Sequence, residues 1–169
     1  SMLTDQDAVI TADAIDRLWQ TLHENDRIGV VQPLVRDFHD GIYSAGHRYN
    51  DYHVCHPITR EPTITDRPIR RPSTTLLGTL IRDDLIDEVG LLDERFGIYW
   101  ESSDLGFRAR KRGWDVVLDP RAVAQHDRDL SELDGGELYY VYRNWLLFWA
   151  KYAPATARRI RDEYWPTSE

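Results

Sequence analysis

The sequence predicts an α/β fold with one principal domain. Apolar runs of strand length alternate along the chain with segments of helical periodicity, which is the pattern of an α/β protein. The 169 residues can bury one core, and contents of 41% hydrophobic and 30% charged residues are ordinary for a soluble domain. The single cysteine, Cys55, excludes an internal disulfide framework and a cysteine zinc site. We expect the domain to cover Leu3 to Tyr152, with a helical extension over 153–169.

The first part of the chain is expected to hold one helix, one buried strand and a long loop. Thr11 is a suitable N-cap, and apolar residues then recur with helical spacing until Asn25 and Asp26 end the helix. Ile28–Val35 reads as a buried strand, and residues 42–49 as a short strand or one arm of a hairpin. Tyr52–Ser73 is rich in proline and is expected to be a long irregular loop that shapes acceptor choice.

The second part of the chain is expected to continue the alternation of strands and helices. The expected elements are a strand over Thr74–Arg82 with Gly78 in its middle, a helix over Asp83–Val89 closed by Gly90, a helix from Glu101 to Gly113, two short extended pieces broken at Pro120, an aromatic helix over Glu137–Ala153, and a last helix from Pro154 to about Trp165. A glycine inside a strand often marks the close approach of a ligand or of another backbone.

The charge of the chain excludes some classes of partner. The net charge of -8 argues against nonspecific binding of nucleic acid, because no basic surplus is available to neutralise phosphates. No apolar run approaches the roughly 20 residues of a membrane-spanning helix. We therefore expect a cytoplasmic protein.

Asp5 and Asp7 form an acidic pair just before the first helix, at the expected end of a strand. Residues at i and i+2 of an extended chain point to the same side, so the two carboxylates would share one face. Two like charges at so short a distance repel each other unless a cation lies between them, and a divalent metal ion is the usual cation. The alternative is a solvated acidic turn at the end of a strand.

A second acidic pair, Glu101 and Asp104, lies three residues apart at a helix start, so both carboxylates lie on one helix face. Favourable interaction with the helix dipole is a sufficient structural reason for both. Tyr99 and Trp100 precede them, and aromatic residues beside first-turn acids can line a sugar-binding cleft or simply pack.

His126 follows an extended segment and would serve as a metal ligand if that segment met Asp5 and Asp7; the alternative is a structural histidine. His53 and His56 flank Cys55, which leaves a Cys-His nucleophile pair open.

The aromatic helix with Arg143 and Asn144 suits either a membrane interface or the core. Three arginines of the last helix would lie against phosphate head groups or be solvated; they are Arg158, Arg159 and Arg161.

The order of these motifs resembles the C-terminal part of family-2 glycosyltransferases with the GT-A fold, in their rhamnosyl- and galactofuranosyltransferase-like branch. The segment "LTDQDAVITADAIDRLWQTLHENDRIGVVQPLV" corresponds to the family's DxD motif with its helix and strand. The segment "LLGTLIRDDLIDEVGLLDERFGIYWESSDLGFRARKRGWDVVLDPRAVAQH" resembles the acceptor-side core, and "YYVYRNWLLFWAKY" resembles the aromatic helix that follows. The resemblance covers about Leu3 to Tyr152 and implies a partial GT-A fold, a mixed sheet flanked by helices with aromatic helices at its C-terminal end.

By this resemblance, Asp5, Asp7 and His126 would hold Mg²⁺ or Mn²⁺ on the diphosphate of a nucleotide-sugar donor. In inverting members a carboxylate deprotonates the acceptor hydroxyl. It is normally the second residue of a Glu-Asp-x-Asp pattern, and here that position is Ser102, which leaves Glu101 or Asp104 as the catalytic base. The expected substrate-binding residues are Gly78, Trp100, Arg108 and Arg143.

The resemblance favours a metal-dependent inverting glycosyltransferase that acts on a glycan or lipid-linked acceptor in polysaccharide or glycolipid biosynthesis, with peripheral contact at the inner face of the membrane. The family's N-terminal βαβ portion, which holds the nucleotide, has no counterpart in these residues, so the chain alone should bind a nucleotide sugar poorly. The second hypothesis is a degenerate relative that binds a glycan or nucleotide without turnover, as Ser102 suggests. A third, a structural or partner-binding module, requires the acidic pairs and His126 to be unrelated.

Overall fold

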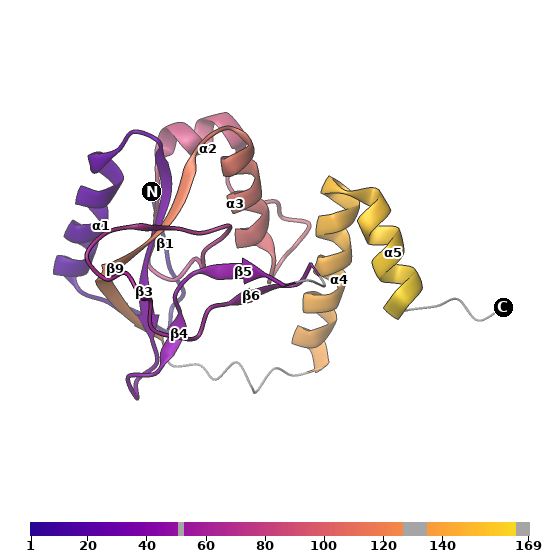
Figure 1. Cartoon of the computed structure of the whole chain (residues 1–169), viewed down its shortest axis with the longest axis horizontal. Helices are drawn as coiled ribbons and strands as arrows, with labels where there is room; N and C mark the ends of the chain where they lie inside the picture. Colours follow the sequence, from indigo (N-terminus) through magenta and orange to yellow (C-terminus); the bar gives the residue numbers. More distant parts are fainter. Residues whose placement is uncertain (51–52, 127–134, 165–169) are drawn as a thin grey trace.

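The computed structural model describes residues 1–50, 53–126 and 135–164, and Figure 1 shows their arrangement. The helices are α1 (Ala12–Glu24), α2 (Asp83–Val89), α3 (Glu101–Lys111), α4 (Gly135–Tyr152) and α5 (Pro154–Tyr164). The strands are β1 (Met2–Leu3), β2 (Ala8–Ile10), β3 (Ile28–Arg36), β4 (Ile42–Ser44), β5 (His47–Tyr49), β6 (Cys55–Pro57), β7 (Ile69–Arg70), β8 (Thr79–Ile81) and β9 (Asp115–His126). Tyr52 and Trp165, two bounds of the expected elements, lie outside the described residues.

Within the described residues, seven strands form one mixed sheet and two form a separate hairpin. The path through the sheet is β1-β8-β3-β9-β2, with β4 paired to β3 and β7 paired to β9. The central strands β3 and β9 are parallel, and the other pairs in the sheet are antiparallel. Strands β5 and β6 pair only with each other. The expected α/β fold with a mixed sheet is thus confirmed.

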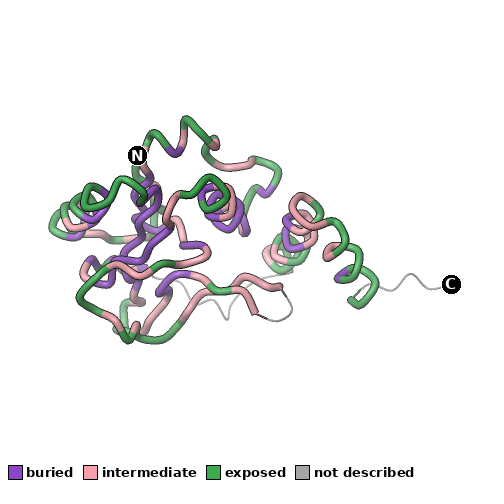
Figure 2. Tube along the Cα trace, turned by 45° about the horizontal axis from the view of Figure 1, so that its top comes forward, coloured by how far each residue is buried: buried purple, intermediate pink, exposed green. Residues whose placement is uncertain are grey.

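Helices cover both faces of the sheet, because successive side chains of a strand point to opposite sides. On one face Val31 packs with Leu18 of α1, and both are fully buried. On the other face Val30 packs with Leu105 of α3, and α2 joins the same cluster. Figure 2 shows the buried chain running along the central strands and the inner sides of these helices. The sheet is therefore held rigidly between two cores.

An aromatic core cluster joins α4 and α5 to the rest of the chain. Its buried members are Phe96, Trp100, Trp145, Phe148 and Ile160. The outer side of α4 exposes Leu138, Tyr139 and Tyr140. The aromatic helix therefore packs against the core through its buried residues and leaves other large side chains exposed; Figure 2 shows buried and exposed stretches alternating along it.

A strained turn leads into α3 and is fastened by one side chain of α4. Tyr99 and Trp100 have φ values of 66° and 73°, which place non-glycine residues in the left-handed region. The side-chain amide nitrogen of the fully buried Asn144 lies 2.7 Å from the carbonyl oxygens of Phe96 and Ile98, and 2.8 Å from that of Tyr99. Asn144 thus fixes the turn that determines where α3 begins.

Strand β9 is continuous, although the sequence predicted a break at Pro120. Pro33 of β3 is in register with Asp119, and Leu34 is in register with Val123, so residues 120–122 form an irregularity within the strand. Neither proline can donate to the ladder, which explains why the register shifts there. The Asp119 carboxylate accepts hydrogen bonds from the backbone and guanidinium of Arg121 at 3.0 and 2.9 Å, and this allows the strand to resume.

Two other segments differ from expectation. The predicted loop contains β6 and β7, and the strand predicted over Thr74–Arg82 is limited to β8, so Gly78 precedes it. Asp5 and Asp7 flank a turn rather than ending a strand, and the Ala8 amide donates to the Asp5 carbonyl at 3.3 Å. The N-cap at Thr11 is confirmed, since its hydroxyl accepts from the Ala14 amide.

Replacing the buried amide of Asn144 with an apolar group of similar size should destabilise the protein. In Asn144→Leu the carbonyl groups of the turn lose their donor, and each unpaired buried group costs about 1–3 kcal/mol, so we expect a loss of about 3 kcal/mol in the free energy of unfolding. Urea unfolding measures this, with Gln20→Leu at an exposed site of α1 as the control. Equal effects of the two substitutions would contradict the assigned role of Asn144.

Candidate functional site

Pairing of β2 with β9 brings the acidic turn beside His126. Ala8 is in register with His126, so Asp7, the residue before it, lies next to the imidazole. The Nε2 atom of His126 is 3.3 Å from an Asp7 carboxylate oxygen. One ligand atom from each of Asp5, Asp7 and His126 can be chosen so that all three lie within 4.8 Å of one another. The acidic turn and His126, which are far apart in the sequence, are therefore gathered at one point.

The chemistry of these three residues fits a hard divalent cation. The two carboxylates are exposed and face a common point, and oxygen donors with one imidazole suit Mg²⁺ or Mn²⁺. The imidazole of His126 is buried and contacts the ring of Tyr43 in a tilted arrangement, with ring centroids 4.6 Å apart and an interplanar angle of 54°, which holds its orientation. Its Nδ1 atom is buried without a hydrogen-bond partner.

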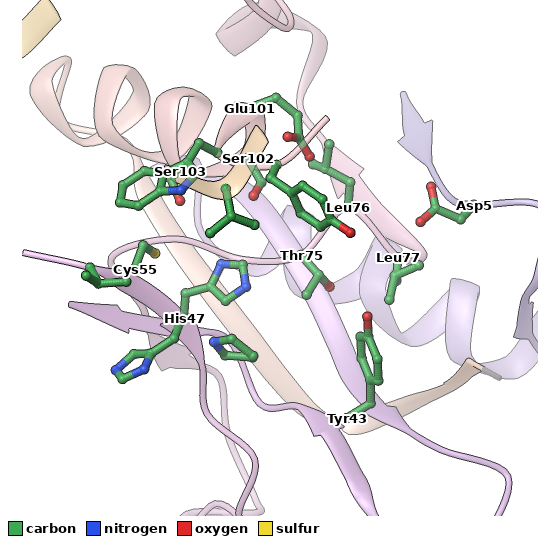
Figure 3. Close-up of a pocket in the computed structure, with 16 residues that line it drawn as sticks. Asp5, Tyr43, His47, Cys55, Thr75, Leu76, Leu77, Glu101, Ser102 and Ser103 are labelled. Atoms are coloured by element: carbon green, nitrogen blue, oxygen red, sulfur yellow. The ribbon is translucent and has the colours of Figure 1, made fainter. Parts of the chain in front are cut away.

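A pocket of about 400 Å³ opens beside this cluster (Figure 3). Asp5 lies at one end of it, and His47 and Cys55 of the β5–β6 hairpin lie at the other. Glu101, at the start of α3, and Thr75 line the part between them. The pocket therefore connects the acidic cluster to the hairpin, past the N-terminus of α3.

The Glu101 side chain faces the same pocket as Asp5 and is largely withdrawn from water. Its Oε2 atom is buried and has no hydrogen-bond partner. Burial raises the pKa of Glu101, and the negative charge of Asp5 raises it further, while the amides of Glu101 and Ser102 act in the opposite direction. A carboxylate with a raised pKa in a pocket is a candidate general base.

Ser102 and Trp100 also line the pocket, whereas Gly78 does not. Gly78 has a φ of 64°, and a Cβ atom there would lie 2.9 Å from the Ile10 side chain. The glycine therefore allows the Ile10 side chain to approach the backbone closely. We propose no substrate contact for Gly78.

The charged groups of Asp104 and Arg108 form a structural network outside the pocket lining. The Asp104 carboxylate is fully buried and accepts from Arg108 Nε at 2.7 Å, Lys151 Nζ at 2.5 Å and the Tyr152 hydroxyl at 2.6 Å. Arg108 also donates to the carbonyls of Val89 and Gly90 at the end of α2. In place of the catalytic and substrate-binding roles expected from the sequence, we propose that these two residues join α2 and α4 to α3.

Arg143 likewise has intramolecular partners away from the pocket lining. Its guanidinium donates to the Arg95 carbonyl at 2.9 Å and to the Asn144 side-chain oxygen at 2.7 Å. Because the amide nitrogen of Asn144 holds the turn before α3, we propose that Arg143 orients that amide rather than a substrate.

Cys55 is unsuited to act as a nucleophile. Burial raises the pKa of its thiol to about 11, so the thiol stays protonated at neutral pH. His53 lies against the ring of Trp149 and 2.7 Å from the Arg159 guanidinium. His47 on β5 has its pKa lowered to about 4, by burial first and by His56 second, so its imidazole is neutral. We therefore do not propose a nucleophilic Cys-His pair at Cys55.

Two residues at the site, Tyr43 and Thr75, were not predicted from the sequence. Tyr43 reaches His126 only because β4 pairs with the end of β3, a contact that no local pattern reveals. Thr75 lines the pocket from a segment that had been assigned to a strand by its apolar character. A signal for Thr75 was available, since a polar pair, Thr74-Thr75, opens that apolar run.

A solved structure with a similar fold identifies the fold of the chain. Over 96% of this chain and 37% of the other, the structure is similar to that of GalNAc-T7 with UDP, GalNAc and Mn2+, with a TM-score of 0.60 and 13% sequence identity. The likeness shows that the chain has the glycosyltransferase GT-A fold.

The chain is also similar in sequence to a curated glycosyltransferase. The chain is 32% identical over 130 residues to an N-acetylglucosaminyl-diphospho-decaprenol L-rhamnosyltransferase from Mycobacterium tuberculosis, found in two strains, and the match covers 68% of this chain. It spans 42% of that relative's length. No family model matches the chain. The chain therefore has the GT-A glycosyltransferase fold and is homologous to a glycosyltransferase.

Removing the buried carboxylate of Asp104 should destabilise the chain strongly. In Asp104→Ala the charges of Arg108 and Lys151 lose their common partner, and breaking a buried ion pair in this way costs about 3 kcal/mol in the free energy of unfolding. Urea unfolding measures the loss, and Asp87→Ala, at an exposed position of α2, is the control. A stability close to that of the parent protein would refute the proposed structural role.

Proposed function

We propose that the protein is a metal-dependent, inverting glycosyltransferase that moves a sugar from a nucleotide-sugar donor to a hydroxyl of a glycan or lipid-linked acceptor. The observation that carries the proposal is that a candidate metal cluster and a buried carboxylate line one pocket: Asp5 belongs to both the cluster and the pocket, and Glu101 faces it. Homology to a glycosyltransferase supports the reaction class.

Asp5, Asp7 and His126 would hold the metal ion, with the carboxylates supplying oxygen donors and the imidazole a nitrogen donor. A bound Mg²⁺ or Mn²⁺ supplies positive charge to the donor diphosphate and favours departure of the nucleotide. The GalNAc-T7 structure, which contains UDP and Mn2+, supports a divalent metal. Tyr43 would support the ligand set by keeping the His126 ring in place.

Glu101 would act as the general base on the acceptor. It would take the proton of the attacking hydroxyl while the acceptor oxygen forms a bond to the anomeric carbon and the bond to the diphosphate oxygen breaks on the opposite side. That geometry inverts the configuration at the anomeric carbon. Ser102, at the position where the family's usual pattern has the base, would contact the acceptor through its hydroxyl.

The alternative proposal is a degenerate module that binds a glycan or nucleotide without turnover. The observation that favours it is Ser102, because a serine hydroxyl does not accept a proton at neutral pH. The raised pKa of Glu101 favours the enzyme, since a carboxylate oxygen that is buried beside a pocket without a partner is costly and is more readily understood as a catalytic feature.

The relative's name gives a lipid-linked acceptor, and this supports a membrane-bound substrate here. Within the parts of the chain that the structure describes, no helix is long and apolar enough to cross a membrane. The exposed Leu138, Tyr139 and Tyr140 on α4 support peripheral contact with a membrane surface, where tyrosine is favoured. We propose that the protein works at the inner face of the cell membrane.

Removal of a ligand should weaken the binding of Mn²⁺. Asp5→Asn or His126→Ala should raise the dissociation constant for Mn²⁺ at least about tenfold, because the first variant loses the negative charge of one ligand and the second loses the nitrogen donor. Isothermal titration calorimetry measures this, and Asp13→Asn, an exposed aspartate of α1, is the matched control. If the first two variants bind Mn²⁺ as the parent protein does, the metal site is wrongly assigned.

Loss of the Glu101 carboxylate should have opposite effects on activity and stability. In the full-length protein, Glu101→Gln should lower the transfer rate by about 10²–10⁴-fold, the usual contribution of a general base. The pKa of Glu101 is raised on folding, so its ionised form opposes folding once the pH exceeds the folded-state pKa. Glu101→Gln should therefore raise the urea midpoint at pH 7, and this gain should disappear in acid, below the unfolded-state pKa. A lowered midpoint at pH 7 would count against the unpaired, buried carboxylate.

The variant Ser102→Asp separates the enzyme from the degenerate module. If Glu101 is the base, Ser102→Asp in the full-length protein should leave the rate of nucleoside diphosphate release unchanged or lower. A large gain in that rate would show that Ser102 marks a lost base and would support the degenerate module.

A further inference from the structure

We propose that the side of the pocket that runs from Thr75 to the β5–β6 hairpin, here called the hairpin end, is a subsite for one neutral sugar ring of the acceptor, with Thr75 and His56 as its hydrogen-bonding residues. The inference rests on the proposed function, because the metal cluster and Glu101 define which end of the pocket faces the donor. In Figure 3, Asp5 lies at one end, His47 and Cys55 lie at the other, and Glu101 lies between. A sugar at the hairpin end would present its hydroxyl to Glu101 from the side opposite to Asp5.

The backbone of Thr75 is fixed on both sides by fully buried polar residues. Its amide donates to the side-chain oxygen of Gln32 at 2.8 Å, and its carbonyl accepts from the Thr79 hydroxyl at 2.8 Å. The hydroxyl of Thr75 itself is buried at the pocket wall and has no hydrogen-bond partner. A buried hydroxyl without a partner costs about 1–3 kcal/mol, and a sugar hydroxyl in the pocket would remove that cost.

His56 contributes a second polar atom of the same kind from the hairpin. Its Nε2 atom is buried and has no partner, although the residue lines the pocket. Burial lowers the pKa of His56, and the charge of Arg48 lowers it further, so the ring is neutral and offers one donor and one acceptor. Two unpaired groups on two separate segments, 75 and 56, suit a ligand with several hydroxyls.

The charges around the pocket favour a neutral ligand. The described lining residues include two carboxylates, Asp5 and Glu101, and no lysine or arginine. Without a metal ion these carboxylates would repel a phosphate or a uronic acid, and we place the diphosphate of a lipid-linked acceptor outside the hairpin end. Trp100 and Pro57 supply apolar lining against which the face of a sugar ring can pack. A volume of about 400 Å³ is in the range of small-ligand sites.

Binding of methyl glycosides to the chain, without metal or nucleotide, tests the inference. Saturation-transfer NMR titration should show binding of methyl N-acetylglucosaminide or methyl rhamnoside, and at least about tenfold weaker binding of methyl glucuronide. Thr75→Val should weaken the neutral glycoside about tenfold, the effect of one lost hydrogen bond, and should not lower the unfolding midpoint, because the hydroxyl has no partner in the protein. Thr75→Ser, which retains the hydroxyl, should restore binding, and Thr65→Val, at an exposed site, is the matched control.

Three outcomes would overturn the subsite. The first is no saturation transfer to either neutral glycoside at millimolar concentration, and the second is equal binding by Thr75→Val or by the glucuronide. The third is weakening by Thr75→Val only of a nucleotide-linked sugar in the presence of Mn²⁺, which would make this a donor subsite. Because Mn²⁺ binding at Asp5, Asp7 and His126 is measured separately, the subsite can fail while the proposed function stands, and the reverse is also true.

Discussion

The parallel pairing of β3 with β9 is the constraint on which the candidate site depends. Each strand offers its other edge to a further strand near its carboxyl end: β4 pairs with β3 at Val35 and Arg36, and β2 pairs with β9 up to His126. The first pairing places Tyr43 against the His126 ring, and the second places Asp7 beside its Nε2 atom. Asp5, Asp7 and His126 form a candidate metal cluster because the hydrophobic core on both faces of the sheet holds these strand ends together.

Hydrogen bonds from residues of α4 also determine where α3 begins. Asn144 fixes the strained turn at Tyr99 and Trp100, while Lys151 and Tyr152 hold Asp104 one turn further along α3. Between these two attachments the helix can begin only where Glu101 faces the pocket. The aromatic helix therefore positions Glu101 through polar groups on its inner side, and its exposed tyrosines take no part in this.

Local patterns in the sequence predicted the helices and strands. Which site residues meet in space was predicted only in part. The helical spacing after Thr11, the buried strand from Ile28 and the glycine that closes α2 are all local signals, and each is confirmed. The meeting of His126 with the acidic turn was expected only on condition that the segments met, because register is a long-range property. Asp104 illustrates the limit: its spacing from Glu101 was read correctly, but its partners on α4 lie more than forty residues away.

Departures from ordinary packing rules gather at this one pocket. Among the described residues, buried polar atoms without partners include Glu101 Oε2, Thr75 Oγ1 and His56 Nε2 on its wall, and His126 Nδ1 in the adjacent cluster. Each such atom opposes folding, and so do the left-handed residues before α3. A module that served only to pack would gain stability by pairing or replacing these groups. Unsatisfied groups that converge on a cavity beside a candidate metal cluster are instead what a site needs when its missing partners are the hydroxyls of a substrate.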